Sequence, residues 1–141
     1  MKVFLSYSQS DKKWADYLRL SLPTHFRDSS GLNEIELWDP AVELEPGANW
    51  RLESGKALQN ADAMLVLLSP DSVKSEFVQS EIDYALASPQ FRGRVISLLL
   101  KPTKDVPWIL RKQPFIEASA EREATVTRVA GALKSVAHAT P

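Results

Sequence analysis

Apolar positions along the chain fall into short runs separated by polar segments that contain prolines and glycines. The clearest run, Ala63–Leu68, has six apolar residues in succession, which is typical of a strand buried on both faces. A second long run predicts a buried strand over residues 94–100. Shorter runs predict three more strands, over residues 3–5, 35–38 and 115–116. Alternation of apolar and polar positions in residues 35–38 favours an edge or near-edge position for that strand.

Helical spacing of apolar residues fills the gaps between these runs. It predicts helices over residues 12–22, 50–60 and 120–137. Pro23 and the polar run 27–31 are expected to end the first of these helices. A further helix follows Ser69 and Pro70, which we interpret as its N-cap and first residue. Its apolar stripe consists of Val78, Ile82, Ala85 and Leu86.

Two segments lack such spacing. Residues 39–49 hold two prolines and a glycine and are expected to form a loop. Residues 101–114 hold three prolines and are expected to be irregular, with Trp108, Ile109 and Leu110 packing back onto the core. We find no internal repeat and no second domain.

Repeated strand–helix units predict a mostly parallel sheet with right-handed crossovers. We therefore expect an α/β fold, a flavodoxin-like three-layer sandwich with a parallel five-stranded sheet of order 2-1-3-4-5 and helices on both faces. In this order the loops 6–11, 39–49 and 69–81 meet at one edge of the sheet. That edge is where open α/β sheets bind ligands.

Composition excludes several classes of protein. The 141 residues suffice for one domain, and a formal net charge of -1 gives no reason to expect nucleic acid or an anionic membrane as partner. No cysteine is present, so disulfides and thiolate zinc sites are excluded. The start resembles no signal peptide and no run is long enough to span a membrane, so we expect a cytoplasmic protein. His25 and His138 are isolated in the sequence, and we expect no metal site.

Common nucleotide-binding and catalytic motifs do not match either. The stretch from Gly47 to Ala57 has the wrong spacing for a phosphate-cradling loop, and no GxGxxG follows the first strand. No GxSxG elbow supports a Ser-His-Asp triad. A phospho-acceptor receiver domain needs an aspartate after the third strand, where this chain has Leu68 and Ser69.

Over nearly its whole length the chain resembles a TIR domain (Toll/interleukin-1 receptor homology) of the bacterial kind. Five motifs in the same order carry the resemblance, and together they are specific although each alone is weak. They are VFLSYS at 3–8 with Asp11, WD at 38–39 leading to PGANW at 46–50, ALQNAD at 57–62, LLSP at 67–70 and SEFVQSE at 75–81.

The resemblance implies one of two roles. Some TIR domains are NAD+ glycohydrolases or cyclases that act in antiphage defence and cell death, releasing nicotinamide and either ADP-ribose or a cyclic isomer. Others are adaptors that assemble through TIR–TIR contacts. By motif position, Glu81 corresponds to the catalytic glutamate of the enzymatic members, and Phe77 stands where the family often has tryptophan. Residues 39–49 correspond to the BB loop, which gates the pocket and contacts a neighbouring subunit in the family.

Elementary chemistry supports a single carboxylate at position 81. Nicotinamide leaves NAD+ as a neutral molecule, so no general acid is needed, unlike in ordinary glycosidases. One carboxylate that orients the ribose and stabilises an oxocarbenium-like transition state suffices. Phe77, Tyr7 or Trp38 is expected to flank the cationic ring, and N–H groups near Asp11 to meet the pyrophosphate.

The predicted site therefore has three parts. The catalytic residue is Glu81, and NAD+ is a substrate, so that no cofactor is expected. Residues expected to bind the substrate are Tyr7, Ser8, Trp38, Asp39 and Phe77. BB-loop residues expected to mediate assembly are Glu43, Leu44, Glu45, Pro46, Gly47 and Asn49.

Each of these residues also has a purely structural interpretation. Glutamates on helices are usually solvated, and aromatic residues such as Phe77 usually pack in cores. Gly47 suits a turn with positive φ, and Trp50 is expected in the core. Ser8 and Ser10 can simply cap a helix. Trp38 and Asp39 can form a plug at the edge of the sheet, with the aspartate as a cap.

Two hypotheses follow, an NAD+-consuming enzyme that needs self-association and a non-catalytic TIR–TIR adaptor. The presence of Glu81 favours the enzyme, because an adaptor needs no acid there. We expect a TIR domain over residues 1–138, with 139–141 as a tail or linker to a sensor domain. The product, the activating signal and the assembly geometry are left open by the sequence.

Overall fold

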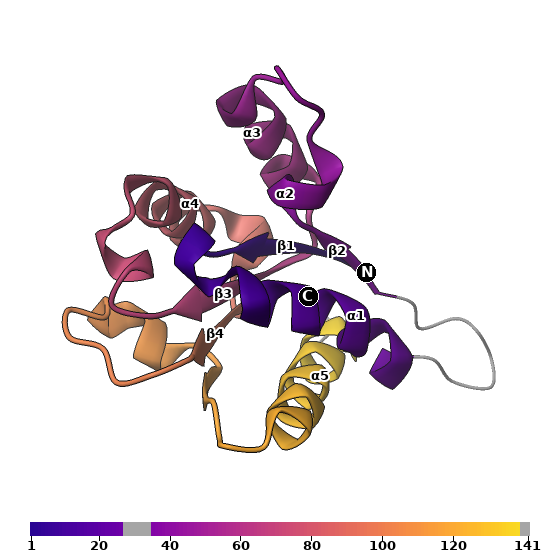
Figure 1. The fold of residues 1–141 in the computed structure, drawn as a ribbon, viewed down its shortest axis with the longest axis vertical. Helices are drawn as coiled ribbons and strands as arrows, with labels where there is room; N and C mark the ends of the chain where they lie inside the picture. Colours follow the sequence, from indigo (N-terminus) through magenta and orange to yellow (C-terminus); the bar gives the residue numbers. More distant parts are fainter. Residues whose placement is uncertain (27–34, 139–141) are drawn as a thin grey trace.

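Five parallel strands form one sheet in the order β2-β1-β3-β4-β5 (Figure 1), as expected. The computed structural model describes residues 1–26 and 35–138. The strands are β1 (Lys2–Ser6), β2 (Glu36–Trp38), β3 (Ala63–Leu68), β4 (Val95–Leu99) and β5 (Phe115–Glu117). Strand β3 lies at the centre and all six of its residues are buried, because helices cover both faces of the sheet. The short β2 is an edge strand, as its alternating pattern predicts.

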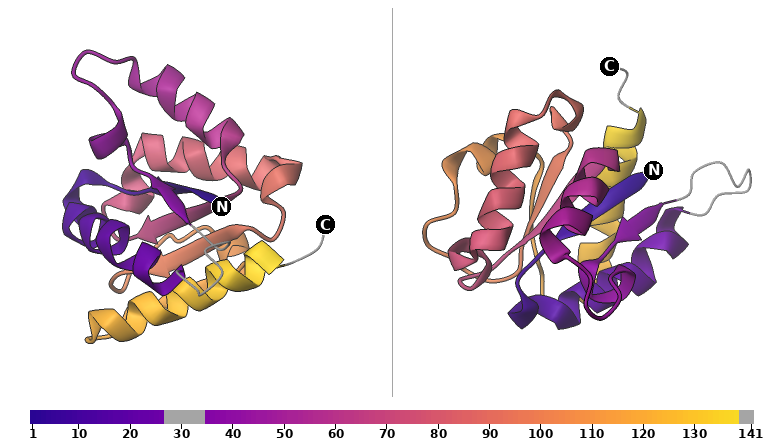
Figure 2. Two further views of the ribbon diagram at one scale, coloured as in Figure 1. Left: turned by 90° about the vertical axis from the view of Figure 1, so that its right-hand side faces the viewer. Right: turned by 90° about the horizontal axis from the view of Figure 1, so that it is seen from above.

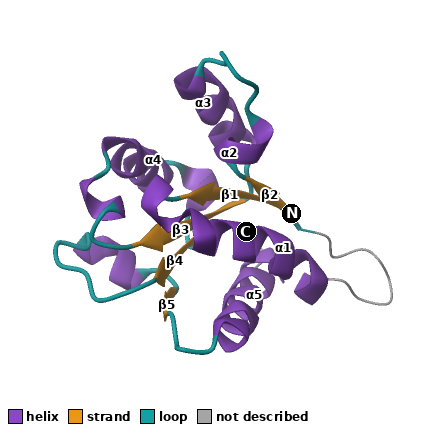
Figure 3. Ribbon diagram, in the orientation of Figure 1, coloured by secondary structure: helices purple, strands orange, loops and turns teal. Residues whose placement is uncertain are grey.

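Helices lie on both sides of this sheet, so the molecule has three layers (Figures 2 and 3). The α-helices are α1 (Lys12–Phe26), α2 (Pro40–Glu43), α3 (Trp50–Asn60), α4 (Glu76–Ala87) and α5 (Arg122–His138). Short 3-10 helices are η1 (Gln9–Asp11), η2 (Ser72–Lys74), η3 (Pro89–Phe91) and η4 (Trp108–Lys112). Figure 1 places α2 and α3 together at the upper end of the molecule, beyond β2.

Each face of the sheet has its own hydrophobic core. Helices α1 and α5 pack side by side on one face, where Leu18 and Val129 are fully buried. Helix α4 covers the other face through Val78, Ile82 and Ala85. Helix α3 contributes much less to this second core, since Leu58 is its only buried residue and Ala57 is partly buried.

Two helix boundaries differ from the sequence expectation. Pro23 lies inside α1, which continues to Phe26, because burial of Leu22 and Phe26 in the core offsets the one hydrogen bond that the proline cannot donate. The polar run 27–31 falls outside the described residues. The helix after β3 does not begin at Ser69 and Pro70. Those residues lie before η2, and α4 begins at Glu76 with Ser75 as its N-cap, which accepts a hydrogen bond from the Val78 N–H.

Further differences concern the two segments expected to be irregular. Residues 40–43 of the BB loop form the short helix α2, which Asp39 caps. Residues 108–112 form η4, in which Leu110 is buried but Trp108 is 73% exposed, so only part of that segment packs on the core. Trp50, expected in the core, is 44% exposed because it begins a helix that stands at the end of the molecule.

The tail expected at residues 139–141 lies outside the described part of the chain. None of the helices within residues 1–26 and 35–138 combines the length and apolar character needed to cross a membrane.

Candidate active site

Glu81 reaches from the middle of α4 to the carboxyl end of β1. The hydroxyl of Ser6, the last residue of β1, donates a hydrogen bond to Oε1 of Glu81 at 2.8 Å. Ser6 is only 1% exposed, and Glu81 itself is half-buried. The carboxyl group is therefore held at the carboxyl ends of the strands, where a parallel sheet favours a ligand site, and is not a freely solvated surface group.

Burial changes the acidity of this carboxyl group. It raises the pKa of Glu81 from 4.5 to about 7, and the hydrogen bond from Ser6 opposes that rise. The group therefore changes charge near neutral pH. Such strongly perturbed carboxyl groups in clefts are typical of functional sites.

A cleft of about 360 Å³ lies between α3 and α4, and Glu81 lines it. Phe77, one helical turn before Glu81, lines the same cleft and is 58% exposed. The spacing of four residues places both side chains on one face of α4. Phe77 is thus not a core residue in this structure; it forms an apolar surface beside the carboxyl group.

Helix α3 supplies the opposite wall of the cleft through Arg51, Ser54 and Leu58. The guanidinium carbon of Arg51 lies 5.7 Å from the centre of the Phe77 ring, which is within the range of a cation–π contact. No signal in the sequence identifies Arg51 or Ser54, because contacts between the two helices depend on how α3 is placed.

Tyr7 and Asp39 lie close to one another but beneath the surface. The Tyr7 hydroxyl donates to Oδ1 of Asp39 at 2.6 Å, and Tyr7 is 9% and Asp39 0% exposed. Burial, together with this hydrogen bond, raises the pKa of Tyr7 well above its usual value. Oδ1 of Asp39 also accepts from the Ala41 N–H, and Arg19 Nε lies 4.0 Å from Oδ2. Neither Tyr7 nor Asp39 lines the cleft of Glu81; both connect β1 to the start of the BB loop.

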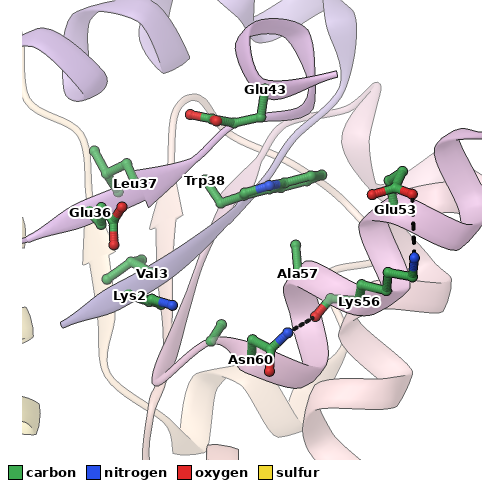
Figure 4. Close-up of a pocket in the computed structure, with 11 residues that line it drawn as sticks. Lys2, Val3, Glu36, Leu37, Trp38, Glu43, Glu53, Lys56, Ala57 and Asn60 are labelled. Carbon is green, nitrogen blue, oxygen red and sulfur yellow. Dashed lines mark hydrogen bonds and ion pairs between the residues drawn. The ribbon is translucent and has the colours of Figure 1, made fainter. Parts of the chain in front are cut away.

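Trp38 lies in a second cavity, of about 300 Å³, between the sheet edge and helices α2 and α3 (Figure 4). Its ring stacks on Phe4 with centroids 5.1 Å apart. Figure 4 shows the ring extending from β2 towards Ala57 of α3, with Glu43 above it. Trp38 and Phe77 therefore lie in different cavities. Trp38 and Asp39 instead fill space at the edge of the sheet, as their structural interpretation expects.

The rest of the BB loop connects α2 to α3. The Ala48 N–H donates to the Glu45 carbonyl oxygen at 3.0 Å, with Pro46 and Gly47 between them. Gly47 has a φ of 85°, so this is the arrangement of a type II turn, in which glycine is favoured at the third position. Asn49 caps α3 by accepting from the Leu52 N–H, and Leu44 ends α2. No BB-loop residue lines the cleft of Glu81 in this chain.

Ser8 and Asp11 take capping and buried positions near the same edge. Ser8 caps η1 by accepting from the Ser10 N–H. Asp11 is buried and accepts a hydrogen bond from the Ser69 hydroxyl, which links the loops after β1 and β3. Burial raises the pKa of Asp11, whereas Ser69 and Lys101 act in the opposite direction. Residues from the loops 6–11 and 69–81 therefore meet, as the strand order predicts.

Comparison with known proteins gives one family, and several solved structures share the fold of this chain. A family model described as TIR domain matches residues 3–134. No curated protein matches the chain. Among solved structures, the TIR domain of the Toll-related receptor TRR-2 from the lower metazoan Hydra magnipapillata has a TM-score of 0.72 at 18% identity, covering 96% of this chain and 98% of that one.

Two other structures show a similar fold. A prokaryotic SEFIR domain has a TM-score of 0.61 at 15% identity, covering 94% of this chain and 91% of its own. The TIR domains of the activated Roq1 resistosome, which directly recognises the pathogen effector XopQ, have a TM-score of 0.52 at 20% identity, covering 99% and 84%. At these identities the similarity concerns the fold.

Proposed function

This chain belongs to the TIR domain family, and on that basis we propose that it is an NAD+ glycohydrolase whose catalytic residue is Glu81. The observation that carries the proposal is the pairing of Glu81 with Phe77 in one cleft, with Ser6 donating to the carboxyl group. A half-buried carboxyl beside an exposed aromatic ring matches a substrate that carries a cationic ring on a ribose.

The proposed reaction needs stabilisation of positive charge from the protein and no general acid. The bond between ribose C1′ and the nicotinamide nitrogen breaks, and its electron pair stays on that nitrogen, which becomes neutral. Positive charge develops on the ribose, and the Glu81 carboxylate stabilises it. Water then adds to C1′ and loses a proton, giving ADP-ribose; attack by another atom of the same molecule gives a cyclic isomer instead.

Burial of Glu81 and the charge of the substrate act together in this reaction. A carboxylate that is poorly hydrated interacts more strongly with developing positive charge than one in bulk water. A cationic substrate beside it also favours the ionised form, so binding lowers the pKa of Glu81 from about 7. Phe77 offers its π face to the pyridinium.

The test measures nicotinamide release from NAD+ by concentrated protein. We expect Glu81→Ala and Glu81→Gln to lower the rate at least about a hundredfold, because the main electrostatic stabiliser is lost. Asp83→Asn is the matched control. Asp83 is an exposed carboxylate on the same helix that does not line the cleft, so this variant should retain the wild-type rate.

Two outcomes would contradict the proposed enzymatic activity of Glu81. One is a wild-type protein that releases no nicotinamide even when forced into clusters. The other is a Glu81→Gln variant that is folded and as active as the Asp83→Asn variant.

Self-assembly forms the second part of the proposal. Large apolar side chains are exposed along the BB loop and the start of α3, with Val42 50%, Trp50 44% and Leu52 53% exposed. Exposed apolar groups of this kind favour contact with another protein. Since the BB loop of the same chain does not line the cleft of Glu81, we propose that a neighbouring copy completes it. Solved TIR domains within a resistosome support such an assembly.

The same exposed surface favours the alternative function, a non-catalytic TIR–TIR adaptor. A protein that assembles but releases no nicotinamide would have this function. An enzyme activated by assembly would instead suit the defence and cell-death roles that the family implies.

A further inference from the structure

Arg51 places its cationic group on the aromatic face that the proposed substrate needs. Its guanidinium carbon lies 5.7 Å from the centre of the Phe77 ring, and Phe77 is otherwise 58% exposed. A guanidinium and a nicotinamide ring are both flat cations that bind to a π face. The two therefore compete for the same surface of Phe77.

The position of Arg51 is not explained by the stability of its own helix. Arg51 is the second residue of α3, where the helix macrodipole disfavours a cation and favours an anion. Among the ion pairs formed within residues 1–26 and 35–138, none includes Arg51. Its neighbours on α3 differ in this respect, since Lys56 pairs with Glu53 at 3.7 Å.

The charges of the cleft give Arg51 a second partner once a ligand is bound. Of the described residues that line the cleft, Arg51 is the one cation, and Glu76 and Glu81 are the carboxylates. A dinucleotide carries a dianionic pyrophosphate a few bonds away from its cationic ring. Without Arg51, the charged side chains that this dianion meets among the described residues of the cleft would all be negative, with only neutral groups such as Ser54 and Ser80 beside them.

Building on the proposed function, we infer that Arg51 is a specificity-determining residue that selects a pyrophosphate-bearing substrate by exchanging partners. In the free protein its guanidinium covers Phe77. On binding, the pyridinium takes the Phe77 face and the guanidinium donates hydrogen bonds to the pyrophosphate, for which its planar fork is well suited. A nicotinamide riboside, which has the ring and no phosphate, displaces Arg51 without this compensation.

The test compares the binding of three ligands by calorimetry in a Glu81→Gln background, which prevents turnover. The ligands are NAD+, ADP-ribose, which has the pyrophosphate without the pyridinium, and nicotinamide riboside. We expect Arg51→Ala to weaken NAD+ and ADP-ribose about tenfold. The same change should leave nicotinamide riboside unaffected or tighten it up to about fivefold, because a competing cation is removed.

Two further variants control for charge and for the fold. Arg51→Lys keeps the charge but not the fork, and should fall between Arg51→Ala and the parent. Lys56→Ala removes an exposed cation from the same helix outside the cleft, and all three dissociation constants should match those of the parent.

Equal effects of Arg51→Ala on all three ligands, or no effect on any, would overturn this inference while leaving hydrolysis of NAD+ by the wild type intact. The expected binding pattern in a protein whose wild type does not hydrolyse NAD+ would support the role of Arg51 and overturn the proposed activity. Failure of all three ligands to bind would overturn this inference, and together with a wild type that releases no nicotinamide it would overturn both.

Discussion

Two opposing influences act on the carboxyl group of Glu81. Burial disfavours its charged form, and the Ser6 hydroxyl favours it. With a pKa of about 7, roughly half of the free protein carries the carboxylate at neutral pH. In the proposed reaction only the carboxylate stabilises positive charge on the ribose, so we expect activity to depend on pH around neutrality.

The first prediction at this scale concerns the pH dependence of nicotinamide release. We expect kcat/KM to rise as pH increases through about 7, following ionisation of Glu81 in the free enzyme. Ser6→Ala removes the donor that lowers this pKa, so the rise should move to higher pH by about 0.5 to 1 unit. Ser10→Ala, a nearby serine whose side chain is exposed, should leave the profile unchanged. A profile for Ser6→Ala that coincides with the wild type would refute the role of this hydrogen bond.

The same raised pKa predicts a change in stability with a definite sign. Between pH 4.5 and about 7 the folded protein keeps a proton on Glu81 that the unfolded chain has lost. The free energy of unfolding therefore falls as the pH rises through this window. Glu81→Gln removes the dependence, so we expect the variant to be more stable than the wild type by about 1–3 kcal/mol at pH 8 and little changed at pH 4. Urea denaturation at the two pH values measures this, and equal effects at both would contradict it.

At the scale of elements, the BB loop is held to the sheet by one fully buried side chain. Asp39 caps α2 through the Ala41 N–H at 2.9 Å and accepts from the Tyr7 hydroxyl at 2.6 Å. We expect Asp39→Ala to lower the free energy of unfolding by about 2–4 kcal/mol, because it removes a cap and leaves a buried hydroxyl without its acceptor.

Asn49→Ala provides the control for this prediction, because Asn49 caps the next helix from an exposed position. Its loss should cost about 1 kcal/mol. Chemical denaturation of both variants gives the comparison. Equal costs would mean that the hydrogen bond from Tyr7 adds nothing to the cap.

Most elements could be predicted from the sequence because their signals are local. The six-residue run of β3, the edge pattern of β2 and the stripe on α4 each identify an element and its buried face. Boundaries were less accurate where tertiary contacts decide. The Ser69 hydroxyl is drawn into hydrogen bonds with Asp11 and the Ser72 N–H, so it serves η2 and leaves the cap of α4 to Ser75.

The candidate site could be predicted only in part. Glu81 and Phe77 share a cleft because their spacing of four on one helix fixes their relative position. Asp39 and Trp38 adjoin a strand end, but whether such residues face a ligand or the interior depends on packing. The contribution of Arg51 had no local signal, since it arises from the placement of α3 opposite α4.

For the whole molecule, the arrangement of exposed apolar side chains suggests a surface for self-association around Val42, Trp50 and Leu52. If a neighbouring copy completes the cleft, the rate of nicotinamide release per subunit should rise with protein concentration. Trp50→Ser should weaken self-association, so that at least about tenfold more protein is needed to reach the same rate per subunit, because large aromatic groups dominate protein interfaces. Enzyme assays paired with sedimentation measure both quantities.

Trp108→Ser is the matched control, since Trp108 is 73% exposed on a different part of the molecule, in η4. It should retain the wild-type association and activity. A dilute, monomeric wild-type sample as active per subunit as a concentrated one would refute the requirement for assembly.

The light attachment of α3 has a consequence for how this domain can diversify. One wall of the cleft, on α4, is tied into the core by Val78, Ile82 and Ala85, whereas the other is tied mainly by Leu58. Substitutions on the facing side of α3 other than at Leu58 are therefore expected to cost the fold little. A lineage of such domains can therefore explore new ligands by changing that helix while the carboxyl group on α4 stays unaltered.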